Sequence, residues 1–552
     1  MKKTALTILL TMAASVLMHA QSAYDAWLFS ENNYEGTARS VAMGNAFTAL
    51  GGDLGAVTIN PAGSAVAPYS QLTITPSLTF SANTSVGVPY EGSSDPYFQR
   101  TFKSRMTRAG IPNVGFTFNF DTGRKSGLKR ITAGFVMNRT NSWCEDIYAN
   151  GINSNTSFLA ATAAEMSGQG ITTDMLLDAD AYRNPDLYWK DIVAYRSGMV
   201  SGITSHPDAY IGATETLTSE DPLEVAQEGQ VDQTYGRSIT GSKYEYLFNA
   251  GANISDFLYI GINLGINSLS YDYARYFKEK AVDPEDFKNS FTGQDGLVHD
   301  TFFSRAIYRY EYSTTGSGVF GKLGIIVTPA KGLRFGAAIQ TPTSNEIKEK
   351  RRESAVTEFT DNSFNGEENS PVAEFQYKFN SPFRANFGVA YTFGKMAILS
   401  VDYEVADYGS MRFKYDRHEM TEDDIEYFEG LNEEIENSYG TAHYLRVGAE
   451  VRPVSTIAVR AGYNLSTSAQ TATYDGTEFI PLDRTYGHNI SFGLGYNSKK
   501  SFFADIACRY TFATDEYILP YSDYRINDGF YSPEILSRHS DWKVLLTLGW
   551  RF

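Results

Sequence analysis

Strands with two unlike faces recur along this chain from residue 70 to its last residue. Residues 114–120, VGFTFNF, place large apolar side chains at alternate positions with small or polar residues between them. Residues 258–266, LYIGINLGI, and residues 542–552, WKVLLTLGWRF, repeat the alternation. A period of two residues predicts β-strands that are apolar on one face only.

The polar faces of these strands carry full charges in mid-strand. The charged positions are Arg334, Arg384, Asp402, Glu404, Arg446, Glu450, Arg460, Asp505 and Arg509. A soluble sandwich also alternates, but its dry core could not face so many ions. A barrel lumen hydrates or pairs such groups, so the pattern predicts an all-β fold, a transmembrane antiparallel β-barrel.

The predicted barrel has fourteen strands. They lie near residues 70–82, 110–121, 129–140, 242–254, 257–273, 302–328, 332–348, 371–393, 395–409, 440–453, 455–466, 486–498, 500–513 and 541–552. Short turns and long loops alternate between them, and the longest loop covers residues 141–241. An even count with this alternation is typical of outer-membrane barrels, with short turns in the periplasm and long loops outside the cell.

Residues 1–20 predict a secretory signal peptide. Lys2 and Lys3 give it a positive start, an apolar segment follows, and Ala20 is a small residue at the expected cut, with cleavage after Ala23 as the alternative. No later run is apolar and long enough to predict a membrane helix. The two cysteines, Cys144 and Cys508, occur in unlike contexts, so both are predicted to be free.

A stretch rich in Gly and Ala, residues 36–65, separates the signal from the strands. Thr37 and Asp53 can each cap a short helix, and Pro61 ends the second one. Segments with such small side chains bury no core of their own and suit close packing against another surface. A glycine-rich linker is the other interpretation.

Residues 43–63, MGNAFTALGGDLGAVTINPAG, resemble the N-terminal plug of the FadL/TodX family of outer-membrane proteins that transport hydrophobic compounds. Members carry an Asn-Pro-Ala turn at the matching place, here Asn60, Pro61 and Ala62, followed by Gly63. The resemblance implies a plug over residues 21–69 inside a barrel over residues 70–552. We expect the turn to set the plug's resting position.

The same resemblance implies lateral release of the ligand through the wall, where an irregular strand opens it. Gly134 in the third strand is the candidate for such a kink, and close packing is the alternative role for a strand glycine.

The longest loop contains two predicted helices. One covers residues 158–166, and the other begins at Asn184 and Pro185. In the second, Tyr188, Ile192 and Tyr195 share one face beside Trp189. These four side chains predict either an apolar groove that receives a ligand or a small core of the loop itself.

Motifs for chemistry are missing from the sequence. It has no Gly-x-Ser-x-Gly elbow, phosphate loop or Cys-x-x-Cys, and no second His follows His418-Glu419 at zinc-site spacing. The acidic run at residues 419–436 lacks the turn Gly of a calcium loop and predicts a solvated loop. We therefore predict no catalytic residue, no metal and no cofactor, and the net charge of −17 argues against nucleic acid as a partner.

The resulting hypothesis is a monomeric outer-membrane channel for passive uptake of hydrophobic small molecules, with long-chain fatty acids or related lipids as ligands. Its other partners would be outer-membrane lipid and, during assembly, the barrel-insertion machinery, which recognises a terminal aromatic residue such as Phe552. Two alternatives stay open. One is a shuttle protein of type nine secretion, and the other is an outer-membrane enzyme whose catalytic set assembles only in space.

Overall fold

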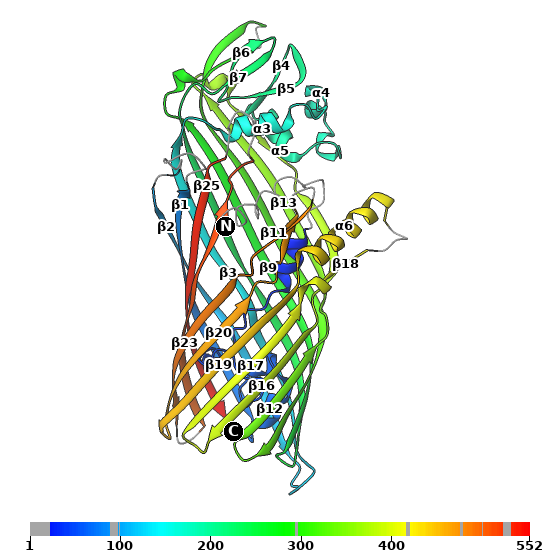
Figure 1. Cartoon of the computed structure of the whole chain (residues 1–552), viewed down its shortest axis with the longest axis vertical. Coiled ribbons are helices and arrows are strands. Elements are labelled where there is room, and N and C mark those ends of the chain that lie inside the picture. The colour runs from blue at the N-terminus through cyan, green and yellow to red at the C-terminus, as the bar shows by residue number, and fades with distance from the viewer. Residues whose placement is uncertain are drawn as a thin grey trace.

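The computed structural model describes residues 22–88, 98, 100–292, 296–415, 420–474, 478–498, 501–522 and 532–552. These residues form a closed antiparallel barrel, which stands upright in Figure 1. The barrel has fourteen strand positions, so the predicted fold class and strand count are confirmed. The predicted signal peptide and the pair His418-Glu419 lie outside the described residues.

Neighbouring strands in the wall are also neighbours in the sequence. In order around the barrel they are β1 (Gln71–Val88), β2 (Phe102–Asp121), β3 (Leu128–Asn153), β8 (Val231–Ile254), β9 (Leu258–Ala281), β11 (Val298–Ala330), β12 with β13 (Leu333–Gln340, Ser344–Phe359), β16 with β15 (Arg384–Phe393, Ala373–Asn380), β17 with β18 (Ala397–Asp407, Arg412–Lys414), β19 (Thr441–Val454), β20 (Ile457–Thr467), β23 (Tyr486–Asn497), β24 (Phe502–Ile518) and β25 (Glu534–Arg551). The pairing of β25 with β1 closes the ring.

Several strands are longer than the sequence predicts, mostly toward the long-loop end. The third predicted strand, residues 129–140, is β3, which runs to Asn153, and its partner β8 begins at Val231. Residues 141–153 and 231–241 were therefore wrongly assigned to the loop. In this upper part polar residues such as Asp146 and Asn150 alternate on the outer face with Tyr148 and Ile152, so the apolar face is interrupted although the ladder continues.

The outer face carries an apolar belt between two levels of aromatic rings. Tyr403, Tyr463 and Trp542 are exposed at the upper level, and Tyr496 and Trp550 at the lower level. Trp542 and Trp550 lie in one strand, eight residues apart, which corresponds to about 27 Å along a strand and less once it tilts. This is the height of the apolar band of a transmembrane barrel, about 25 Å.

A plug fills the lumen of the barrel. It contains α1 (Ala23–Ser30), α2 (Ala38–Ala42) and the 3₁₀ turns η2 (Gly55–Thr58) and η3 (Pro61–Val66). It is the blue segment that is visible inside the strands in Figure 1.

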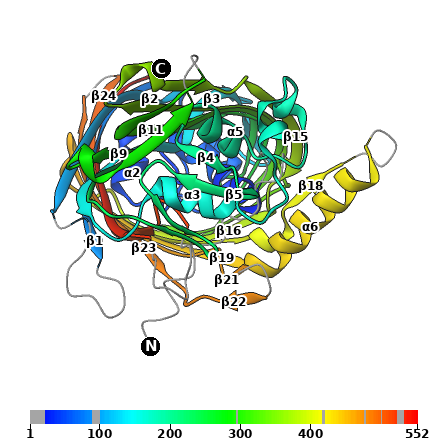
Figure 2. The same cartoon turned by 90° about the horizontal axis from the view of Figure 1, so that it is seen from above.

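A cap covers the upper mouth, as the view from above shows (Figure 2). It is built from α3 (Phe158–Met166), α4 (Thr173–Leu177), η4 (Ala181–Arg183), α5 (Trp189–Arg196), β4 (Val200–Ile203), β5 (His206–Gly212), β6 (Thr216–Glu220) and β7 (Leu223–Ala226). The predicted helix at residues 158–166 is confirmed. None of the helices in the described part of the chain combines the length and apolarity needed to cross a membrane.

An amphipathic helix, α6 (Glu422–Ser438), lies outside the barrel beside β18 (Figures 1 and 2). Its Phe428, Leu431 and Ile435 are buried, and the same apolar cluster includes Ala26 and Phe29 of the plug helix α1. The prediction of a solvated loop over residues 419–436 was therefore wrong for the described part, because a buried apolar face stabilises a helix there.

Short segments complete the upper part of the molecule. They are η5 (Pro284–Asp286), β10 (Lys288–Thr292), η6 (Asn362–Phe364), β14 (Gly366–Asn369), η7 (Tyr408–Ser410), β21 (Ala472–Tyr474) and β22 (Phe479–Pro481). Cys144 and Cys508 are free, as predicted.

Candidate functional site: the plugged lumen

The plug is held by local turns that its sequence encodes. Thr37 caps α2, because its side chain accepts a hydrogen bond from the amide of Ser40, as predicted. Asp53 does not cap an α-helix, and the segment after it is the 3₁₀ turn η2. Its Oδ1 instead accepts hydrogen bonds from the Gly55 amide (2.9 Å) and from Thr37 Oγ1 (2.6 Å). Asp53 thereby joins the two turns of the plug.

Asn60 connects the plug to the wall and has no exposed surface. Its Oδ1 accepts a hydrogen bond from the amide of Ala62 at 3.0 Å. Its Nδ2 donates to the carbonyl of Thr48 in the plug at 2.6 Å, and to Ile325 of β11 at 3.1 Å and Ala337 of β12 at 3.4 Å. One carboxamide therefore stabilises the turn and contacts two strands.

Wall glycines leave the space that this turn occupies. A Cβ atom on Gly324 would lie 1.9 Å from Asn60 Oδ1, and one on Gly336 would lie 2.1 Å from the carbonyl oxygen of Thr48. Either substitution would displace the plug. The same close approach to plug atoms occurs at Gly261, Gly448 and Gly462. Pro61, Ala62 and Gly63 are buried in this contact.

Charged lumen residues form buried ion pairs. Glu404 accepts hydrogen bonds from Arg384 (2.9 Å) and Arg446 (2.7 Å), and all three side chains are almost completely buried. Glu450 pairs with Arg39 of the plug at 2.9 Å. Removing one partner of a buried pair typically costs about 3–5 kcal/mol, because the other charge stays buried. The Arg39–Glu450 pair therefore ties the plug to the wall, whereas the pairs of Glu404 join neighbouring strands of the wall.

Glu35 of the plug faces three cations of the wall. It accepts hydrogen bonds from Arg139 of β3 (2.5 Å) and Lys543 of β25 (2.7 Å), and Arg509 of β24 lies 3.8 Å away. All four side chains are at least 95 % buried. Asp541 of β25 also lies 3.9 Å from Lys543. Three cations still outnumber the two carboxylates, so this cluster (Glu35, Arg139, Arg509 and Lys543) favours anions. The sequence analysis missed Glu35, which no motif distinguishes from a surface glutamate.

The wall is interrupted between β2 and β3. Their ladder runs from Asp121 opposite Arg130 to Asn113 opposite Asn138 and ends there. Above that point β2 pairs with β1, and β3 pairs with β8. Pro112, which has no amide hydrogen, is the first residue of β2 beyond the ladder.

The interruption begins at mid-height of the apolar belt. Asn113 lies opposite Thr75 of β1, whose hydroxyl is 2.7 Å from that of Thr547 in β25. Thr547 in turn lies between the outward-facing Trp542 and Trp550. The unpaired part of the wall therefore faces the upper half of the belt.

Gly134 lies below this interruption in a regular part of β3. It is opposite Thr117 of β2 and Asn249 of β8, in ladders that continue on both sides. A Cβ atom there would lie 2.5 Å from the carbonyl oxygen of Phe116. Close packing of the two strands is therefore the role that the structure gives Gly134.

The four groove candidates of the longest loop belong to the cap. Ile192 has no exposed surface and lies in the core of the cap, and Tyr195 packs edge-on against Tyr210. Trp189 Nε1 donates to the carbonyl of Tyr182 at 3.0 Å. Tyr188 is 40 % exposed and precedes the first residue of α5. These contacts correspond to the small core that was the alternative to a groove.

The helix of the cap begins later than predicted. Asn184 and Pro185 precede it, and α5 starts at Trp189. Asn184 Oδ1 accepts a hydrogen bond from the amide of Asp186 at 3.0 Å, which forms a local turn instead of a helix start.

No family model matches this chain, and no curated protein sequence matches it. Three solved structures resemble it over nearly their whole length. The toluene transporter TodX of Pseudomonas putida is 13 % identical with a TM-score of 0.46, and the match covers 94 % of this chain and 98 % of that one. A FadL homologue of Pseudomonas aeruginosa is 13 % identical with a TM-score of 0.47, and the match covers 94 % and 98 % of the two chains. The toluene transporter TbuX of Ralstonia pickettii is 13 % identical with a TM-score of 0.45, and the match covers 94 % and 99 %.

Proposed function

We propose that this protein is an outer-membrane channel that admits hydrophobic small molecules past a movable plug and releases them sideways into the membrane. Two features together carry the proposal. The lumen is plugged, and β2 and β3 are not paired with each other in the upper half of the apolar belt. An open water-filled pore would need neither feature.

The proposed exit lies above Asn113 and Asn138, not at Gly134. Two neighbouring strands without backbone pairing can separate at lower cost than strands in a ladder. Arg108 of β2 donates a hydrogen bond to the carbonyl of Trp143 of β3 at 3.0 Å, so a side chain bridges the strands here. A side-chain bridge can open and close without disrupting the barrel.

The proposed substrate class is long-chain fatty acids. The cluster of Glu35, Arg139, Arg509 and Lys543 lies just inside the unpaired wall, and its three cations surround the Glu35 carboxylate, with Asp541 3.9 Å from Lys543. The carboxylate of a fatty acid could replace that of Glu35, and the plug would then be released. A neutral hydrocarbon has no group for this exchange.

Uptake of a labelled long-chain fatty acid, with the alcohol of the same chain length for comparison, tests the function. Cells that lack a transporter of their own would express the wild type or Asn60→Ala. The substitution removes the hydrogen bonds to β11 and β12 and leaves buried backbone groups unpaired, at about 1–3 kcal/mol for each group. We expect the variant to form the barrel and to change fatty-acid uptake or leakage of small polar solutes several-fold.

Asn497→Ala is the matched control, since Asn497 accepts a hydrogen bond from Arg551 at 2.9 Å near a short turn, outside the plug. It should behave as the wild type. If wild-type cells take up neither compound above background, the channel function is wrong. If they take up the alcohol as fast as the acid, the substrate class is wrong.

A further inference from the structure

The upper part of β2 has a free edge. Residues 102–110 pair with β1 on one side, and among the described residues no strand pairs with the other side until the ladder with β3 begins at Asn113. Thr107 is opposite Phe80, which is opposite Trp542 at the upper aromatic level. Residues 102–106 therefore lie above the apolar belt, outside the membrane. A free strand edge offers backbone N–H and C=O groups that can pair with another chain.

The edge is free because the upper parts of β1 and β2 lie over the outer face of β3 instead of beside it. Asn83, on the inner face of β1, donates to the carbonyl of Asp146 in β3 at 3.0 Å. The rings of Phe102 in β2 and Tyr148 in β3 meet edge-on, with 5.0 Å between their centroids. Cys144, on the outer face of β3, is only 7 % exposed. A strand added beside β2 would therefore lie over the next strand of the wall, β8.

The outer face of β8 leaves room for such a strand. Its outward residues at this height are small, namely Gly236, Ser238 and Thr240. Tyr148 of β3 and Tyr276 of β9 are directly opposite Gly236 on its two sides, and both are 36 % exposed. A Cβ atom on Gly236 would lie 2.2 Å from the ring of Tyr276, so this ring lies across the glycine. Two aromatic rings thus form an apolar floor next to the edge.

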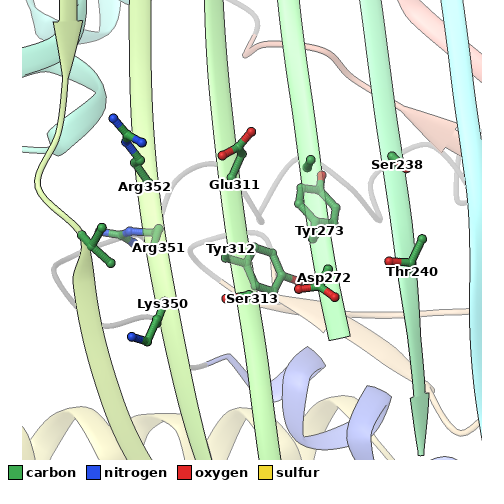
Figure 3. A pocket seen from close by; sticks show the side chains of 12 residues that line it. Ser238, Thr240, Asp272, Tyr273, Glu311, Tyr312, Ser313, Lys350, Arg351 and Arg352 are labelled. Atoms are coloured by element: carbon green, nitrogen blue, oxygen red, sulfur yellow. The ribbon is translucent and has the colours of Figure 1, made fainter. Parts of the chain in front are cut away.

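The wall below these rings is hollowed (Figure 3). The notch has a volume of about 370 Å³, and its lining includes Ser238 and Thr240. Arg108 of β2 donates a hydrogen bond to the carbonyl of Gly241 in β8, which places the edge of β2 beside this part of the wall.

Two cations on the outward side of the edge have no carboxylate partner. Lys103 and Arg105 are exposed, and among the described residues no carboxylate oxygen lies within 4.0 Å of either. The residues directly opposite them in β1 are Thr84 and Ala82, and β1 contains no charged residue. In β25, Arg538 is opposite Thr84, which adds a further positive charge to this row.

The carboxylates of the surrounding strands do not neutralise this edge. Asp515 of β24 pairs with Arg538 at 2.7 Å. Asp146 lies under β1, and Asp272 of β9 lines the notch in the wall. An acidic side chain in an added strand is therefore favoured opposite Lys103 and Arg105, and it is disfavoured on the side that faces the wall.

The charges also decide between two kinds of partner. Charged residues on a free edge keep identical edges apart. Two copies of this edge would bring like charges together, so a second copy of the chain fits poorly, whereas an acidic strand is attracted.

We propose that the free edge of β2 binds an extended segment of another protein as an added β-strand. Acidic side chains of the segment would face outward opposite Lys103 and Arg105. The residues between them would be apolar and would face the wall, against Tyr276 and the small residues of β8. Residues 102–107 offer about 20 Å of edge, which is enough for a short strand. This binding surface is independent of the channel function proposed above.

The test is binding of a labelled peptide of about eight residues, a usual strand length, that alternates glutamate with valine. The comparison peptide has lysine in place of glutamate. Fluorescence anisotropy at low salt would measure the affinity of each peptide for the purified, folded barrel. We expect the acidic peptide to bind at least ten-fold more tightly than the basic one. The edge variant, Lys103→Gln/Arg105→Gln, should bind the acidic peptide about five-fold more weakly, as expected for the loss of two exposed ion pairs.

The control variant, Lys331→Gln/Lys395→Gln, makes the same charge change in exposed turns at the opposite end of the barrel. It should bind the acidic peptide as the wild type does, and heat-dependent gel mobility verifies that all three proteins are folded.

Methylation of alternate backbone nitrogens in the acidic peptide tests the strand pairing on the wild type alone. Methyl groups on the nitrogens that face the edge should abolish binding, and methyl groups on the other set should leave it unchanged. Equal binding of the two peptides, equal binding by the edge variant and the wild type, or indifference to both methylation patterns would overturn the proposal. So would a wild-type dimer that excludes the peptide, which would indicate that a second copy occupies the edge.

Discussion

Asp191 in α5 is a carboxyl group that the cap buries almost completely. Burial raises its pKa to about 7, Glu165 and Glu353 contribute in the same direction, and Lys190 only partly offsets this. The pKa is higher in the folded cap than in the unfolded chain, whose value is 3.8. The folded cap therefore binds more protons between about pH 4 and 7, and its stability is greatest at low pH and falls as the pH rises to 7.

Asp191→Asn should remove this pH dependence. We expect protease to cleave the cap of the wild type several-fold faster at pH 8 than at pH 5, and the cap of the variant at nearly equal rates. Rates would be normalised to a peptide substrate of the same protease. Asp186→Asn is the control at an exposed position and should keep the wild-type slope. A wild-type cap that is equally resistant at both pH values would contradict the prediction.

Residues of the plug differ in how well the sequence predicts them. Thr37 and Asn60 act through bonds to their own local backbone, and these follow from residue type and neighbours. The contacts of Asn60 with β11 and β12, and of Glu35 with β3 and β25, join positions that are distant in the sequence. The residue pattern within one segment does not indicate which distant residues it contacts. The cluster around Glu35 could therefore not be predicted from the sequence.

At the level of elements, α6 shows a signal that was present and not used. Phe428, Leu431 and Ile435 are spaced three and four residues apart, and Thr421 with Asp424 forms a capping box. The dense negative charge favoured a loop in the sequence analysis. Packing against Phe413 and the plug helix outweighs that repulsion, since most of the carboxylates, such as Glu422, Asp423, Glu429 and Glu433, remain on the solvated side.

The side chain of Asn432 in α6 forms hydrogen bonds with the backbone of β18, as a neighbouring strand would. Its Oδ1 accepts a hydrogen bond from the amide of Phe413 at 2.7 Å, and its Nδ2 donates to the carbonyl of Phe413 at 3.2 Å. Asn432→Ala would leave both backbone groups unpaired, at about 1–3 kcal/mol each if they stay dry. We expect faster protease cleavage within α6 and unchanged heat-dependent mobility of the barrel.

Asn437→Ala is the matched control for α6, because Asn437 is exposed on the same helix. It should leave the cleavage rate unchanged. If Asn432→Ala is as resistant as this control, the side chain does not secure the edge of β18.

For the whole molecule, the strand count was predictable because each strand crosses the same belt. The belt imposes one apolar face on every strand, whatever its contacts, and the turns between strands are short at one end. No repeated sequence pattern indicates the cap. The same is true of the two wall positions that are each divided into two strands, β12 with β13 and β15 with β16. They arise where the wall rises above the belt and the apolar face is no longer required.

The last residue of the chain takes part in closing the barrel. The amide of Ser70 donates to the carbonyl of Phe552 at 3.0 Å, and the amide of Phe552 donates to the carbonyl of Ser70 at 3.1 Å. Trp550 is opposite Leu72 in the same ladder. Deleting residues 550–552 leaves the start of β1 without a partner at the lower edge of the belt, where lipid cannot supply the missing hydrogen bonds.

We therefore expect the chain without residues 550–552 to remain unassembled, with no heat-dependent shift in gel mobility and rapid degradation. The matched control is Trp550→Ala/Arg551→Ala/Phe552→Ala, which keeps the backbone bonds and removes the side chains. If closure by the backbone decides assembly, the control assembles and the deletion does not. If recognition of the terminal aromatic residue decides it, both fail. Normal assembly of the deleted chain would show that β25 can close the barrel without its last three residues.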